Sequence, residues 1–88
     1  MLFVTLFRFK RKPTKEMLAE TTKLFEQITK QGAKILGFYW TLGRYDGVVV
    51  IEGPDEKTAM KSLFRFADFV STETLVALSM EEASKLVE

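Results

Sequence analysis

The sequence has 88 residues, 47% of them hydrophobic, and a net charge of +1. This length suits one domain, and the composition excludes an intrinsically disordered chain. The lack of cysteine excludes disulfides and thiolate chemistry. The lack of histidine removes the commonest metal ligand and the usual general base near neutral pH. We therefore expect a single domain over residues 1–88 with no metal and no other cofactor.

The N-terminal stretch MLFVTLF is apolar over seven residues, and basic residues follow it. A signal peptide has its basic residues before the apolar stretch, and a membrane-spanning helix needs about 20 apolar residues. We therefore expect a cytoplasmic protein without a membrane partner.

The first half of the chain predicts a strand, a helix and a second strand. LFVTLFRF is rich in β-branched and aromatic residues, which predicts a strand over residues 2–9. Thr14 can cap a helix over residues 14–31, and a second strand is expected over residues 34–42. The apolar residues of the helix fall on one stripe, formed by Met17, Leu18, Leu24, Phe25 and Ile28.

The second half begins with a hairpin connection in which Gly43 can take a positive φ. A third strand is expected over residues 45–53 and a fourth over residues 70–79. Asp55 can cap the helix between them. The stripe of this helix consists of Ala59, Met60, Leu63, Phe66 and Ala67. After the fourth strand, Ser79 can cap a short helix that runs to the end of the chain.

This order predicts an α+β, ferredoxin-like βαββαβ fold. A four-stranded antiparallel sheet would carry two helices on one face, with the short C-terminal helix after the last strand.

Both faces of this sheet are expected to be apolar, although an antiparallel sheet with one wet face alternates apolar and polar residues. Val48 and Val50 point one way in the third strand, and Val49 and Ile51 point the other way. In the first strand Leu2, Val4 and Leu6 oppose Phe3, Phe7 and Phe9, and in the second Leu36, Phe38 and Trp40 oppose Ile35 and Tyr39. Two helices cover only one face, so we expect a second copy to cover the other, in a homo-oligomer.

Charge is distributed unevenly along the chain. Residues 1–34 hold eight basic and three acidic side chains, whereas residues 35–88 hold five basic and nine acidic ones. This pattern indicates either a solvated surface or complementary contact between copies. The basic stretch of Arg8, Lys10, Arg11, Lys12 and Lys15 indicates a solvated loop or an anion contact. The third strand lacks the Lys/Arg-Gly-Phe run of RNA-recognition domains, so no nucleic-acid partner is expected.

Several short motifs together resemble the GYD domain family, named for Gly-x-Tyr-Asp. The resemblance spans about residues 33–83. It consists of Gly37-Phe38-Tyr39, Gly43-Arg44-Tyr45-Asp46, Pro54-Asp55 and Thr72-Glu73-Thr74-Leu75. It implies a ferredoxin-like fold of the dimeric α/β-barrel type in a family of uncharacterised function. The chain departs from the family pattern at residues 67–70, where relatives tend to have a Gly-Asn-like turn.

The Arg44-Tyr45-Asp46 cluster has two interpretations. In the local one, Gly43 makes the turn, Asp46 accepts backbone N–H groups and Arg44 is solvated. In the functional one, Tyr45 and Asp46 flank the mouth of a pocket, and Asp46 lies on the sheet face away from the helices.

Four further residues are candidates for ligand contact. Tyr39 and Trp40 would pack in the sheet or an interface, or would stack on a flat ligand. Glu73 would be exposed or paired with a basic side chain, or would act as a proton acceptor in the pocket. Thr74 would supply a polar group to that pocket.

These residues support more than one function. The first is an oligomeric, non-catalytic module that binds a small apolar or aromatic molecule at a sheet-face or intersubunit pocket, through Tyr39, Arg44, Asp46 and Thr74. The second is a cofactor-free monooxygenase or isomerase, with Asp46 or Glu73 as base and Tyr39 or Arg44 stabilising charge. The third is a purely structural assembly.

Overall fold

The computed structural model describes residues 1–87, and Glu88 lies outside the described part. The elements in chain order are β1 (Leu2–Phe9), α1 (Lys15–Lys30), β2 (Lys34–Trp40), β3 (Gly47–Glu52), α2 (Glu56–Phe66), β4 (Val70–Ala77) and α3 (Met80–Ser84). The predicted element order is confirmed. The last helix is shorter than predicted, because α3 ends at Ser84 and does not continue along the chain.

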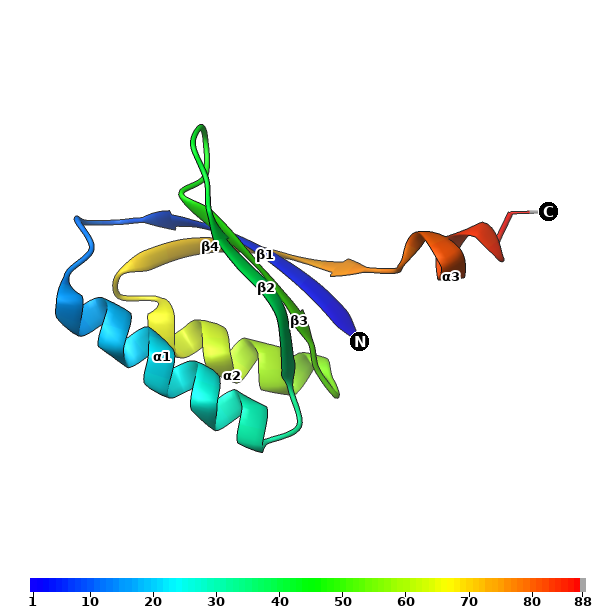
Figure 1. The fold of residues 1–88 in the computed structure, drawn as a ribbon, viewed down its shortest axis with the longest axis horizontal. Coiled ribbons are helices and arrows are strands. Elements are labelled where there is room, and N and C mark those ends of the chain that lie inside the picture. The colour runs from blue at the N-terminus through cyan, green and yellow to red at the C-terminus, as the bar shows by residue number, and fades with distance from the viewer. Residues whose placement is uncertain (88) are drawn as a thin grey trace.

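The four strands form one antiparallel sheet in the order β2-β3-β1-β4. Helices α1 and α2 lie side by side on one face of this sheet (Figure 1). This confirms the α+β, ferredoxin-like fold. The apolar N-terminal stretch forms β1, a central strand with neighbours on both sides. No helix within residues 1–87 has the length and apolar character needed to cross a membrane.

Short polar side chains begin all three helices, as the sequence predicts. Thr14 Oγ1 accepts a hydrogen bond from Met17 N at 3.2 Å, and Asp55 Oδ1 accepts one from Thr58 N at 2.9 Å. Ser79 accepts one in the same way at the start of α3. These acceptors satisfy backbone N–H groups that have no partner in the first helical turn.

A bulge in β2 changes which of its residues share a face. Ile35 pairs with Ile51 and Gly37 with Val50, so the register shifts between them. As a result Ile35, Phe38 and Trp40 face the helices, whereas Leu36 and Tyr39 face away. The predicted alternation, which grouped Leu36 with Phe38 and Trp40, is wrong at Leu36 for this reason.

The layer between sheet and helices holds a small core. Its buried apolar side chains are Phe3, Phe7 and Val49 from the sheet, Met17, Leu24 and Ile28 from α1, and Ala33. Helix α2 contributes none. Met60, predicted on the inner stripe of α2, is 58% exposed. Helix α2 therefore covers the sheet without filling the space beneath it.

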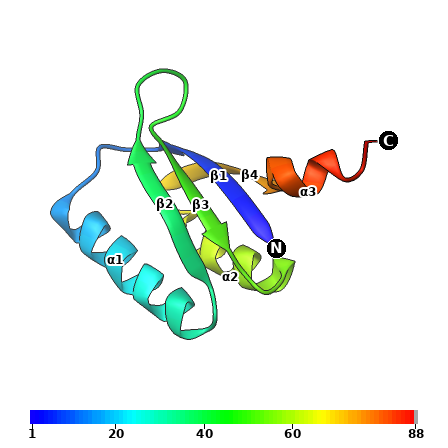
Figure 2. The same ribbon diagram turned by 45° about the vertical axis from the view of Figure 1, so that its right-hand side comes forward.

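The opposite sheet face, here called the outer face, is apolar as predicted. Its central residues Leu2, Val4, Leu6, Val48 and Val50 are half-buried, and Leu36, Tyr39 and Leu75 are exposed. Helix α3 does not cover this face. It projects beyond the end of the sheet in two views of the molecule (Figures 1 and 2).

Candidate functional site

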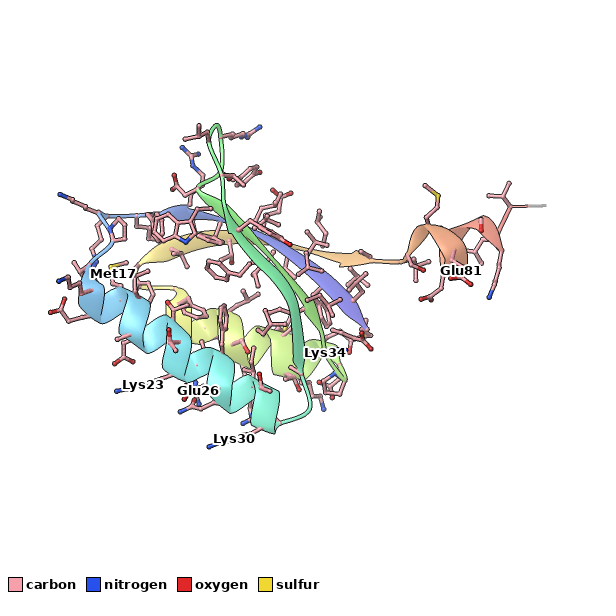
Figure 3. The ribbon with its side chains drawn as sticks, viewed as in Figure 1. Met17, Lys23, Glu26, Lys30, Lys34 and Glu81 are labelled. Atoms are coloured by element: carbon pink, nitrogen blue, oxygen red, sulfur yellow. The ribbon has the colours of Figure 1, made fainter. Side chains whose placement is uncertain are left out.

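A cavity lies between the sheet and the two helices, where side chains from both layers meet (Figure 3). The space open to the centres of water-sized spheres is about 90 Å³. One water molecule needs about 10–15 Å³ by this measure. The lining includes Phe3, Phe7, Phe38, Trp40 and Val49 from the sheet, Met17, Thr21 and Phe25 from α1, and Ala59, Ser62, Leu63 and Phe66 from α2. The cavity therefore has room for a small molecule.

Aromatic rings form one continuous series of contacts around this cavity. The distances between ring centroids are 5.2 Å for Trp40–Phe9, 5.7 Å for Phe9–Phe7, 5.5 Å for Phe7–Phe38, 5.3 Å for Phe38–Phe25, 6.4 Å for Phe25–Phe66 and 5.8 Å for Phe66–Phe69. The rings meet edge to face or tilted, the geometries that aromatic pairs prefer. Another flat ring placed among them would find the same kind of neighbour.

The polar groups of the cavity wall are hydroxyls, and most of them are already engaged. Thr21 Oγ1 donates to Met17 O at 2.8 Å, and Ser62 Oγ donates to Thr58 O at 3.1 Å. Among residues 1–87, none of those that line the cavity is charged at neutral pH. Charged side chains of α1, such as Lys23, Glu26 and Lys30, lie on the side of the helix away from the sheet (Figure 3). The wall therefore favours an uncharged, largely apolar occupant.

Two of the predicted site residues face this cavity layer. The Trp40 ring lines the cavity and is 54% exposed, which places it at the edge. Thr74 Oγ1 lies 2.9 Å from Oγ1 of Thr5, and the buried Thr5 lines the cavity. Thr74 thus acts on the wall through Thr5.

Tyr45 and Asp46 lie in the connection between β2 and β3, not in the strand predicted over residues 45–53. The strand begins only at Gly47, because Asp46 is held by the end of β1. Asp46 N donates to Phe7 O at 2.8 Å, and Asp46 Oδ2 accepts from Phe9 N at 2.8 Å. This geometry corresponds to the local interpretation, in which the carboxylate serves backbone N–H groups.

Tyr45 and Glu73 come together although 28 positions separate them. The Tyr45 hydroxyl donates to Glu73 Oε2 at 2.6 Å. This hydrogen bond, together with the negative charge of Glu73, raises the pKa of Tyr45 above its ordinary value of 10.0. The Arg44 guanidinium lies 5.9 Å from the centre of the Tyr45 ring. Glu73 pairs with Leu6 in the sheet and so belongs to the outer face, as does Tyr39.

The predicted residues therefore occupy two places, with Trp40 and Thr74 on the cavity side and Tyr39, Tyr45 and Glu73 on the outer side. The cavity also depends on residues that the sequence analysis assigned only to the core, chiefly Phe7, Phe38 and Phe66. The sequence did contain a signal for an aromatic cavity wall, because the chain has eight phenylalanines. No cluster of potential metal ligands occurs within the described part of the chain.

A family model for the GYD domain matches residues 3–87. The chain belongs to the GYD domain family. No curated protein gives a match to the sequence. In this GYD domain the Gly-x-Tyr-Asp motif is the β2–β3 connection. Gly43 adopts a φ of 115°, a conformation that favours glycine, while Tyr45 reaches Glu73 on β4 and Asp46 holds the end of β1.

A glycine directly after the motif lets the chain pass close to the cavity wall. A Cβ atom at Gly47 would collide with the Phe7 ring and lie 2.7 Å from the backbone oxygen of Tyr39. The motif and Gly47 together therefore fix the hairpin against β1 and place the Phe7 ring.

Proposed function

We propose that this GYD domain is a homo-oligomeric module that binds a small, uncharged apolar or aromatic molecule in the cavity between the sheet and the helices. The observation that carries the proposal is the cavity wall, which combines a continuous series of aromatic rings with an absence of charged lining residues among residues 1–87. Ligand sites of this kind are concave and mostly apolar, with a few polar groups.

The size of the cavity limits the ligand to about one ring, part of which would lie outside the enclosed space. Its 90 Å³ is below the roughly 150 Å³ of an engineered apolar cavity that holds benzene. The cavity is open at Trp40, which is half exposed, so a single ring fits if its edge projects past this residue. A carboxylate or ammonium group would be desolvated against this wall without a partner.

The placement of the two candidate bases supports binding over acid–base catalysis. Asp46 is occupied by the backbone N–H of Phe9, and Glu73 lies on the outer face. Neither carboxylate lines the cavity. A ring held between the layers would therefore have no carboxylate beside it to accept a proton.

The outer face supports the oligomeric part of the proposal. Its apolar residues come from all four strands, and the chain's own helices lie on the opposite side (Figure 1). A second copy of the chain would bury these residues sheet to sheet, at about 25 cal/mol per Å² of apolar surface. The proposal also includes a cytoplasmic location. It is supported by the apolar N-terminal stretch, which forms strand β1 of the sheet.

Trp40 is the only tryptophan in the chain, so its fluorescence reports directly on the cavity edge. Toluene is expected to change Trp40 emission saturably, with a Kd of about 0.1–1 mM for so small a ligand. Benzoate carries the same ring with a carboxylate, and it should leave the emission unchanged at equal concentration.

Ser62→Leu supplies the matched test of location. Leucine at position 62 would extend into the cavity from α2, so toluene should no longer change the emission. Lys61→Leu adds the same side chain at an exposed position of the same helix and should bind toluene as the wild type does. The proposed site would be contradicted if toluene left the Trp40 emission of the folded protein unchanged. It would also be contradicted if the Ser62→Leu variant still bound toluene.

A further inference from the structure

The C-terminal arm, residues 78–87, continues from β4 and stands clear of the rest of the domain in both ribbon views (Figures 1 and 2). Its helix α3 has five residues, whereas isolated helices shorter than about 12 residues are marginal in water. The large apolar side chains of the arm are exposed: Leu78, Met80, Leu86 and Val87. The arm therefore needs a surface beyond its own domain.

The arm and a cluster of basic residues lie at opposite ends of the molecule. The arm carries Glu81 and Glu82 in the first turn of α3 and Lys85 after it, so two acidic residues and one basic residue leave it a net charge of −1. Figure 3 shows Glu81 beyond the end of β4. In the β1–β4 register, Leu2 pairs with Ala77, next to the arm, and Phe9 pairs with Val70. The basic end therefore lies at the far end of β1. It consists of the exposed residues Arg8, Lys10, Arg11, Lys12 and Lys15.

This separation of charge follows the long axis of the molecule, which measures 48 Å. Two copies can satisfy both ends at once, because each copy carries one acidic arm and one basic end. A symmetric pair in which the two contacts are identical is the commonest arrangement of homodimers.

The arm would also enlarge the contact that the outer face makes. Four strands of this length cover about 20 Å by 25 Å, or about 500 Å² in projection. A standard interface buries about 800 Å² on each partner. The accessible surface of a face with side chains exceeds its projection, and an arm laid on the partner adds its own exposed apolar side chains to the contact.

We propose, on the basis of the homo-oligomer proposed above, that two copies pack outer face to outer face with their β1 strands antiparallel. In this arrangement each C-terminal arm lies on the basic end of its partner, and Glu81 and Glu82 face Arg11 and Lys12. With parallel β1 strands the two acidic arms would meet each other, as would the two basic ends, and like charges at an interface are unfavourable.

Cross-linking distinguishes the two arrangements, because the chain has no cysteine and introduced thiols are unique. The combined variant Lys12→Cys with Glu82→Cys is expected to give a dimer-sized product with a short bifunctional maleimide. Each single variant alone should stay uncross-linked. Positions 12 and 82 lie at opposite ends of one chain, so the product cannot form within a single copy.

Two outcomes would overturn this inference. Cross-linking of Glu82→Cys alone would show arm against arm and therefore the parallel arrangement. A protein that sediments as a dimer but whose combined variant stays uncross-linked would refute the arm contact and leave the homo-oligomer standing. A protein that sediments as a monomer would refute both the arm contact and the homo-oligomer. The toluene titration tests the proposed ligand site separately.

Charge reversal tests the contact without cysteine. Glu81→Lys with Glu82→Lys should raise the dimer Kd at least about tenfold, because attractive pairs in both copies become repulsive. Adding Arg11→Glu and Lys12→Glu to the same chain should restore the Kd. Glu20→Lys with Glu26→Lys changes the net charge equally on exposed positions of α1 and should leave the Kd unchanged. If the second pair of reversals fails to restore the Kd, the proposed contact is wrong.

Discussion

The Tyr45–Glu73 hydrogen bond is the most specific contact that the family motif makes. It joins the β2–β3 connection to β4 at a distance of 2.6 Å between the hydroxyl and Glu73 Oε2. Tyr45 is the motif residue whose side chain reaches β4, whereas the Asp46 side chain accepts a hydrogen bond from the neighbouring end of β1. The motif therefore connects elements that are distant in sequence.

This contact predicts how Tyr45 titrates. In a Tyr39→Phe background Tyr45 is the only tyrosine, so the phenolate absorbance reports it alone. The apparent pKa should lie above 10.0, since the Glu73 carboxylate stabilises the protonated phenol. Replacing Glu73 by glutamine should lower this pKa. If the titration midpoint is the same with and without Glu73→Gln, the hydrogen bond does not exist in solution.

Gly47 is a residue at which the addition of a single Cβ atom would disturb the local structure. In Gly47→Ala the new Cβ would meet the Phe7 ring and the backbone oxygen of Tyr39, 2.7 Å away. Because a backbone atom cannot move aside cheaply, we expect a loss of about 1–3 kcal/mol in the free energy of unfolding. Urea titration followed by circular dichroism measures it.

Gly53→Ala is the matched control for this prediction. A Cβ at Gly53 would lie 3.6 Å from the nearest atom of Phe3, an ordinary contact distance. Equal stability losses for the two variants would mean that backbone freedom, and not the contact with Phe7, decides the role of Gly47.

Of the two helices that lie on the sheet, α2 depends more on its cap, because none of its side chains is buried, whereas α1 buries Met17, Leu24 and Ile28. Asp55 Oδ1 accepts hydrogen bonds from both N and Oγ1 of Thr58, each 2.9 Å long. These bonds to the ionised carboxylate lower the pKa of Asp55 from its ordinary value of 3.8. The cap therefore stabilises the fold at a pH above 3.8, and this stabilisation is lost as the pH falls through the lower pKa of the folded state.

Asp55→Asn tests this prediction, because asparagine keeps an oxygen acceptor but does not titrate. The melting temperature of the wild type should exceed that of the variant at neutral pH, and the difference should shrink in acid. Thermal melts at both pH values measure it. A difference that stays constant with pH would show that the carboxylate charge contributes nothing to the cap.

The order of the elements could be predicted from the sequence, because each helix begins at a residue with a local physical reason to start it. Thr14, Asp55 and Ser79 are short acceptors placed before helical stripes, and all three cap helices. The bulge at residues 35–37 could not be predicted, since it is decided by how β2 pairs with β3. The early end of β2 and late start of β3 have a similar origin, because Asp46 is bound by β1.

The candidate site was harder to predict than the fold. Sequence parity showed that Trp40 and Tyr39 point to opposite faces, but not which face holds the space. The space depends on how α2 lies over the sheet, and Met60, on its predicted inner stripe, turns out to face solvent. Such tertiary placement has no signal in the periodicity of a single helix.

At the scale of the whole molecule, the proposed homo-oligomer rests on the outer face. Val4 lies at its centre, paired with Val50 on β3 and Leu75 on β4. Val4→Lys is expected to give a folded monomer, because the helices and the small core lie on the other side of the sheet. Light scattering after size-exclusion chromatography measures the mass, and circular dichroism checks the fold.

Phe64→Lys is the control for this variant. It places the same charge at a large exposed apolar residue of α2, away from the outer face. It should leave the mass of the protein unchanged. If both variants lower the mass equally, the helices and not the outer face form the interface.

Sedimentation equilibrium of the unmodified chain at low micromolar concentration tests the central claim most directly. A sheet that is apolar on both faces predicts a mass at least twice the 10.1 kDa of one chain. A folded, soluble species at 10.1 kDa would mean that the outer face is stable in water, and it would contradict the proposed assembly.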